Sequence, residues 1–164
     1  MRRGVRLGVD AGKVRVGLAR SDVDGMLAMP YATLQRTKHD DGVARIAAIV
    51  GELEVLEVVV GLPLHMSGAE GGASREARDY AERIARAIDP APVRLVDERL
   101  STVSAHGHLH RSGRPGRAHR QVVDQVAATV ILQAALDGER NSGHPGGELV
   151  RVNDEPAVVK ENGT

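Results

Sequence analysis

The sequence contains no cysteine, no phenylalanine and no tryptophan, and its only aromatic residues are two tyrosines. The lack of cysteine excludes disulfides and thiolate metal sites. Its 164 residues suit one domain with at most a tail, and Val, Ile, Leu and Ala must fill the core. With so few aromatic rings, the protein has little means of stacking on splayed nucleobases, so nucleic-acid recognition would rest on the backbone.

Long hydrophobic runs are also missing. The chain opens with Met1-Arg2-Arg3-Gly4, and no long apolar segment follows. A signal peptide and a membrane span both need such a segment. We therefore expect a cytoplasmic protein.

The net charge is zero, with 22 basic and 22 acidic residues, but the charges are unevenly distributed. Residues 1–136 hold 19 bases and 16 acids, whereas residues 137–164 hold three bases and six acids. The segment 99–120 contains five arginines, four histidines and no acid. Such clustering favours nucleic-acid binding more than the mean charge suggests, although a solvated basic loop beside an acidic tail is the alternative.

Alternating apolar residues predict a β-hairpin at the start of the chain, with strands at 5–10 and 14–19. Pairing Val9 with Val16 keeps the apolar side chains on one face and sets Asp10 opposite Arg15. A shift of two residues would keep the faces and change the partners, so the faces are the firmer prediction.

The remaining pattern predicts an α/β fold of the βαβ type. Strands are expected near 26–34, 58–62 and 93–96, and helices near 40–53, 74–88, 102–110 and 120–136. Parallel strands require right-handed crossovers. The prediction is a mixed five-stranded sheet, with the first three strands antiparallel, the last two parallel and helices on both faces. Residues 1–138 would form this domain, and the Gly-, Pro- and charge-rich residues 139–164 a disordered tail.

Three acidic residues fall at structural joints of this arrangement. Asp10 ends the first strand, Glu98 follows the last strand and Asp124 lies on the most apolar helix. An acid is costly in such a place unless it is paired or binds a metal. Three convergent carboxylates suit Mg²⁺ or Mn²⁺, and two such ions about 4 Å apart can hold a phosphodiester and activate water. The alternatives are pairing of Asp10 with Arg15, pairing of Glu98 with Arg99, and a solvent-facing Asp124.

Two strand glycines have no turn to explain them. Gly8 and Gly17 lie on the same predicted face as Asp10. A glycine within a strand often marks the close approach of a ligand or of another backbone. Ligand approach and close helix packing both remain open.

Four short motifs together resemble the YqgF/RuvX-type family of the RNase H-like superfamily. They are DAGKVRVGLA at 10–19, VGLPL at 60–64 with Gly68 and Gly71, VDERLST at 96–102 and DQVAA at 124–128. The resemblance runs in order from about residue 4 to residue 137. It implies an RNase H-like fold and metal-dependent cleavage of nucleic acid, either at the 5′ end of pre-16S ribosomal RNA or at a Holliday junction.

The resemblance also assigns roles to residues. Asp10, Glu98 and Asp124 fall on the family's proposed catalytic, metal-binding carboxylates. Arg15 and Arg99 fall on motif arginines, which we assign to phosphate contact or to orienting the acids. The chain departs from many relatives near Val14, where they have Thr, and at the polar positions near His65 and Ser67, which puts contacts of that loop with substrate in doubt.

The basic segment offers further nucleic-acid contacts. Planar guanidinium forks suit phosphate oxygens, and such contacts are salt-sensitive. The candidates are Arg111, Arg114, Arg117 and Arg120, beside His106, His108 and His110. The alternating histidines do not suit a helical zinc site, because only the first and third would share a helix face. Asp97 is a possible fourth acid, or a cap for the next helix.

The sequence thus predicts a metal-dependent endonuclease that processes pre-16S ribosomal RNA, with Holliday junction resolution as the alternative. A non-catalytic nucleic-acid-binding module is the rival from another class, and the acid trio argues against it. An actin-like or sugar-kinase-like phosphotransferase is disfavoured because it needs two domains of this kind. The expected partners are structured RNA or branched DNA, with a homodimer and a ribosomal particle left open.

Overall fold

The computed structural model, which describes residues 1–100 and 117–152, is built around a six-stranded mixed sheet. The strands are β1 (Arg6–Ala11), β2 (Arg15–Ser21), β3 (Ala28–Gln35), β4 (Glu57–Leu62), β5 (Val93–Asp97) and β6 (Glu148–Leu149). Their order is β3-β2-β1-β4-β5-β6. β1, β2 and β3 pair antiparallel, whereas β1, β4 and β5 pair parallel.

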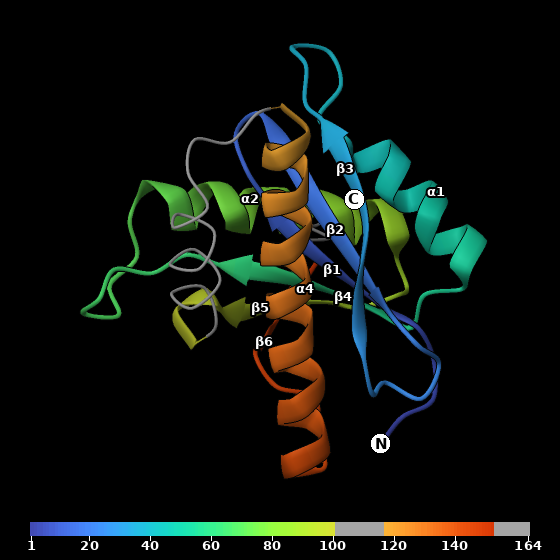
Figure 1. The fold of residues 1–164 in the computed structure, drawn as a ribbon. Coiled ribbons are helices and arrows are strands. Elements are labelled where there is room, and N and C mark those ends of the chain that lie inside the picture. Colours follow the sequence, from blue (N-terminus) through green and yellow to red (C-terminus); the bar gives the residue numbers. More distant parts are fainter. Residues whose placement is uncertain (101–116, 153–164) are drawn as a thin grey trace, which may run out of the picture.

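Helices cover both faces of the sheet, as the sequence predicted (Figure 1). α1 (Val43–Leu53) and α2 (Gly72–Ile88) pack side by side on one face. α4 (Arg117–Ser142) crosses the other face and contacts β1, β2, β3 and β4. A single 3₁₀ turn, η1 (Glu98–Leu100), follows β5. In the described part of the chain, no helix is both long and apolar enough to cross a membrane.

The sheet has six strands rather than the predicted five. β6 consists of two residues that pair antiparallel with β5, a length too short to show an alternating pattern in the sequence. α4 also continues past residue 138, to Ser142. Residues 139–152, which we expected in the tail, thus include the end of α4 and β6, and residues 153–164 lie outside the described residues.

The register of the first hairpin differs from the prediction by two residues. Val9 pairs with Leu18, and Asp10 pairs with Gly17 rather than with Arg15. The turn closes by a hydrogen bond from the Gly12 amide to the Arg15 carbonyl (2.9 Å), one residue later than expected. The faces are as predicted, because a shift of two preserves them.

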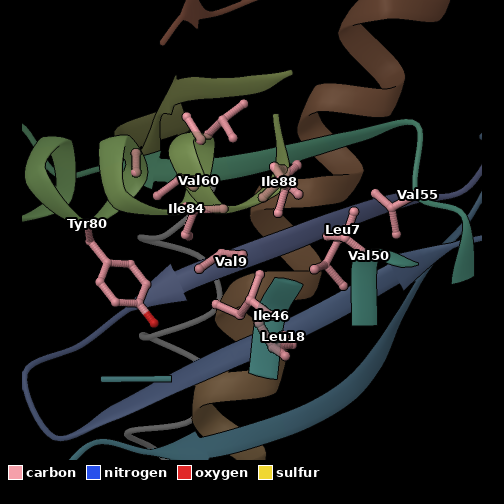
Figure 2. Close-up of a cluster of buried hydrophobic side chains, with 14 of the residues drawn as sticks. Leu7, Val9, Leu18, Ile46, Val50, Val55, Val60, Tyr80, Ile84 and Ile88 are labelled. Carbon is pink, nitrogen blue, oxygen red and sulfur yellow. The ribbon is translucent and has the colours of Figure 1, made fainter. Parts of the chain in front are cut away.

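A tightly packed aliphatic core fills the space between the sheet and the layer of α1 and α2 (Figure 2). The sheet contributes Leu7, Val9, Leu18 and Val60, and the helices contribute Ile46, Val50, Tyr80, Ile84 and Ile88. A second, smaller cluster beneath α4 includes Ala128, Ile131, Leu132 and Leu136. β4 is buried along its whole length, which confirms the prediction of a strand covered on both faces.

A buried ion-pair cluster fixes the C-terminal half of α4 to the sheet. Arg2 Nη2 lies 2.8 Å from Glu139 and 3.0 Å from Glu57, while Arg6 Nη2 lies 3.3 Å from Glu139. Arg94 Nε completes the cluster, 2.7 Å from Glu57. Hydrogen bonding to Arg2 lowers the pKa of Glu139 to about 2. The cluster therefore depends on ionised carboxylates that are almost fully buried.

Glu139→Gln should lower the free energy of unfolding by about 3 kcal/mol, because removing one member of a buried pair leaves its partners uncompensated. Urea denaturation at pH 7 measures this loss. Glu52→Gln, which breaks the exposed pair with Arg45, is the matched control and should cost less than about 1 kcal/mol. Equal losses in the two variants would show that the cluster does not hold α4.

Acidification should weaken the same contact. The pKa of Glu139 lies below its ordinary value of 4.5, so folding favours the ionised carboxylate. Its contribution to stability is fully present above pH 4.5 and is lost as the pH falls towards 2. The difference in stability between wild type and Glu139→Gln should therefore shrink between pH 5 and pH 2, about the range of this titration. A difference that stays constant over this range, in urea titrations at several pH values, would contradict the assignment.

Candidate active site

The three predicted acids are carried by three elements that meet on the α4 side of the sheet. Asp10 lies near the carboxyl end of β1, and Glu98 begins η1 directly after β5. Asp124 lies in the N-terminal half of α4. Their arrangement depends on two glycines of the sheet, one beside Asp124 and one beside Glu98.

Gly17 allows α4 to rest directly on the sheet at Asp124. It pairs with Asp10 across the β1–β2 ladder. A Cβ atom on Gly17 would overlap the carbonyl oxygen of Asp124. Further along, a Cβ on Gly8 would lie 2.7 Å from Cβ of Leu132. Of the two explanations left open for these glycines, close helix packing is therefore the one that the contacts support.

Gly61 gives Glu98 room to reach across β4. It pairs with Val96 of β5, and it follows Val60, which pairs with Val9 of β1. Oε1 of Glu98 lies 2.9 Å from the position that a Cβ on Gly61 would take. The carboxylate thus extends over β4 towards the strand that carries Asp10. Sequence reasoning missed this role, although a glycine within a continuous apolar strand was a visible signal.

The environment of Glu98 disfavours its charged form. Burial raises the pKa of Glu98, and the neighbouring charge of Asp97 raises it further. A cation placed beside the carboxylate would have the opposite effect and favour ionisation. The hard oxygen donors of Glu98, Asp10 and Asp124 are of the kind that Mg²⁺ and Mn²⁺ prefer.

Asp124 is held by an arginine. Arg15 Nε donates to Oδ2 of Asp124 at 2.6 Å, and the two side chains are only 25% and 18% exposed. The predicted placement of Asp10 opposite Arg15 is therefore wrong, because the shifted register moves Arg15 away from Asp10. The alternative of a solvent-facing Asp124 is wrong as well. Within residues 1–100 and 117–152, no three His, Cys, Asp or Glu side chains are arranged as a metal site.

The model of the RuvX family, described as "Holliday junction resolvase", matches residues 4–138. The chain belongs to the RuvX family. The resemblance of the four motifs is thereby confirmed.

The RuvX relatives share most of their length with this chain. A protein of Thermobifida fusca is 55% identical over 92% of this chain and 98% of its own, and one of Streptomyces coelicolor is 47% identical over 93% and 91%. Both carry the name "Putative pre-16S rRNA nuclease". Among solved structures, Thermus thermophilus RuvC in complex with a Holliday junction substrate superposes with a TM-score of 0.55 over 89% of this chain and 99% of its own. At 15% identity this match shows the fold alone, and it confirms the RNase H-like class.

In this RuvX chain, Arg99 pairs with Asp97 rather than with Glu98. Its Nη2 lies 2.6 Å from Oδ2 of Asp97, and its Nη1 donates to the carbonyl of Met66 (3.3 Å). The Arg99 amide also donates to Oδ1 of Asp97 (3.0 Å), so Asp97 caps η1. Hydrogen bonding to Arg99 lowers the pKa of Asp97. Arg99 thus ties the loop after β4 to the segment that carries Glu98.

The other predicted basic contacts are only partly described. Arg120 is exposed in the first turns of α4, at the end of the helix that carries Asp124. Arg117 begins α4, but its side chain lies outside the described residues. Arg111 and Arg114 lie outside them entirely, as do the three alternating histidines. The assignment of these arginines to nucleic-acid binding stays a prediction.

Gly17→Ala should displace α4 at Asp124 and lower the free energy of unfolding by about 2 kcal/mol, because the added Cβ meets helix backbone that cannot rotate away. Gly138→Ala, a substitution within α4 itself, is the control. Its Cβ would meet nothing within 4 Å, and it should raise stability by about 0.5–1 kcal/mol. Thermal denaturation of both variants gives the comparison. A Gly17→Ala protein as stable as wild type would mean that α4 does not lie this close to β2.

Proposed function

We propose that this chain is a divalent-metal-dependent endonuclease that hydrolyses phosphodiester bonds in processing the 5′ end of pre-16S ribosomal RNA. Membership in the RuvX family and the name carried by the curated relatives support the substrate. The observation that carries the chemistry is the placement of the carboxylates on one side of the sheet. There Gly61 has no side chain, and this leaves room for the carboxylate of Glu98. The proposed substrate places the activity in the cytoplasm.

The donor chemistry of Asp10, Glu98 and Asp124 fits Mg²⁺ or Mn²⁺, and these three side chains would hold the metal. Bound there, the metal would supply an activated water and charge stabilisation at the leaving oxygen. Such a charge would favour the ionised form of the half-buried Glu98, whose pKa is raised by burial. Arg15 Nε donates to Oδ2 of Asp124, so this hydrogen bond would have to break for that oxygen to hold a metal.

Arginines would bind the phosphates of the substrate around this site. Arg120 is exposed on the first turns of α4, and Arg99 is exposed beside the loop after β4. Their planar guanidinium groups suit phosphate oxygens and do not read base sequence. Binding should therefore weaken with added salt and depend on the shape of the nucleic acid.

Cleavage of Holliday junctions is the second candidate, favoured by the description of the family model and by the fold shared with RuvC. Resolving a four-way junction takes two symmetric cuts and hence a homodimer, whereas trimming an RNA takes one cut and could occur on a ribosomal particle. A non-catalytic binding module fits less well, because a cluster of carboxylates repels phosphate unless a metal lies between them.

The test compares cleavage of a pre-16S RNA fragment and of a synthetic four-way DNA junction, in Mg²⁺, Mn²⁺ or EDTA. Asp10→Asn, Glu98→Gln and Asp124→Asn should each lose at least about 100-fold in rate, since even outer partners of a metal site cost up to this much. Asp137→Asn is the matched control, because Asp137 lies on the same helix as Asp124 and pairs with Arg140. It should cleave at nearly the wild-type rate.

Each outcome separates the candidates. Metal-dependent cutting of the RNA alone supports the proposal, and cutting of the junction alone supports the second candidate. Salt-sensitive binding without cutting of either substrate, in the presence of both metals, would favour the binding module. Cutting that survives in all three acid variants would refute the assignment of the site.

A further inference from the structure

Arg15 occupies a carboxylate oxygen of Asp124, one of the three proposed metal ligands. Nε of Arg15 is 2.6 Å from Oδ2 of Asp124, a distance typical of a charge-assisted hydrogen bond. Both side chains are largely shielded from solvent, at 25% and 18% exposure. An ion pair shielded in this way is screened less by salt than an exposed one. The pair is thus a defined feature of the site.

The two partners are carried by backbones that are held firmly in place. Arg15 begins β2, pairs with Gln35 of β3 and accepts a hydrogen bond from the Gly12 amide (2.9 Å). The backbone of Asp124 rests on Gly17, where a Cβ would overlap its carbonyl oxygen. Exchange of partners at this point therefore needs side-chain rotation alone.

We propose that Arg15 is a built-in counter-ion for Asp124, which it neutralises before a divalent cation binds and releases once the cation is bound. The guanidinium and the cation compete for Oδ2 of Asp124. Both cannot lie close to this oxygen, because two positive charges so near each other repel. Once released, Arg15 remains beside the site, and its planar fork suits an oxygen of the scissile phosphate. Arg15 thereby couples metal loading to substrate binding.

The charge balance of the site supports this role. Burial and the neighbouring Asp97 raise the pKa of Glu98, so further negative charge on the α4 side of the sheet would be unfavourable. Arg15 balances the charge of Asp124, the carboxylate with which it pairs. Arg99 does not take this role, because Asp97 holds it at the rim of the site. The inference rests on the proposed function for the presence of the metal, but its main test does not require cleavage.

The test is the affinity for Mn²⁺, measured by calorimetry without nucleic acid. Arg15→Gln should bind Mn²⁺ about tenfold more tightly than wild type. The variant lacks the positive charge that competes with the cation for the carboxylate of Asp124. At saturating Mn²⁺, cleavage by Arg15→Gln should be slower than by wild type, because the phosphate contact is lost. Arg15→Lys keeps the charge without the fork, so it should bind Mn²⁺ nearly as wild type does.

Two controls isolate the contact. Arg36→Gln removes the same charge from a neighbouring side chain that donates to the Gly12 carbonyl and stacks on Tyr80, and it should change the affinity less than about twofold. In an Asp124→Asn background, Arg15→Gln should no longer tighten Mn²⁺ binding, because the pair that it breaks is already gone. Circular dichroism checks that each variant is folded.

An affinity for Mn²⁺ that is unchanged or weaker in Arg15→Gln overturns the inference, as does the absence of any Mn²⁺ binding to wild type. Tightening of the same size in the Asp124→Asn background overturns it as well. If wild type cleaves and only the tightening is missing, the proposed function stands without the inference. If Arg15→Gln tightens binding as expected but wild type cleaves neither substrate, the inference stands and the proposed function fails.

Discussion

The direct contact of α4 with bare backbone on the sheet is the constraint on which the site depends. Three glycines, Gly8, Gly17 and Gly61, leave room for the helix or for Glu98. A side chain at Gly17 would force the helix away at the turn that carries Asp124. The position of Asp124 relative to Asp10 and Glu98 is therefore set by the lack of a side chain at Gly17, and not by a contact of the Asp124 side chain.

The same helix is fixed in a different way at its other end. There the buried carboxylate of Glu139 accepts hydrogen bonds from Arg2 and from Arg6. The two attachments fix α4 to the sheet on both sides of its midpoint, and Asp124 lies in the half that rests on Gly17. The position of this acid is thus set partly by contacts far from it along the helix.

The sequence predicted most of the fold, because long apolar patterns and spaced motifs carry that information, whereas the metal-binding role of the three acids stays a prediction. The buried strand β4, the helix α2 and the placement of Asp10 and Glu98 at strand ends all follow from local pattern. The register of the first hairpin did not, since a shift of two residues leaves every face unchanged. The partner of Arg15 and the two-residue strand β6 depend on contacts between distant segments, which no local pattern reveals.

The separation in sequence of these contacts has a consequence for synthesis. Arg2 bonds to Glu139, 137 positions later, and the antiparallel half of the sheet is covered by α4, which spans residues 117–142. Contacts between residues so far apart in the sequence form late, because the second partner must first be synthesised. On the ribosome, a nascent chain with its first five strands complete still lacks Asp124 in place. Asp124 can therefore join Asp10 and Glu98 on the α4 side of the sheet only after the whole segment 117–142 has been synthesised and has folded onto it.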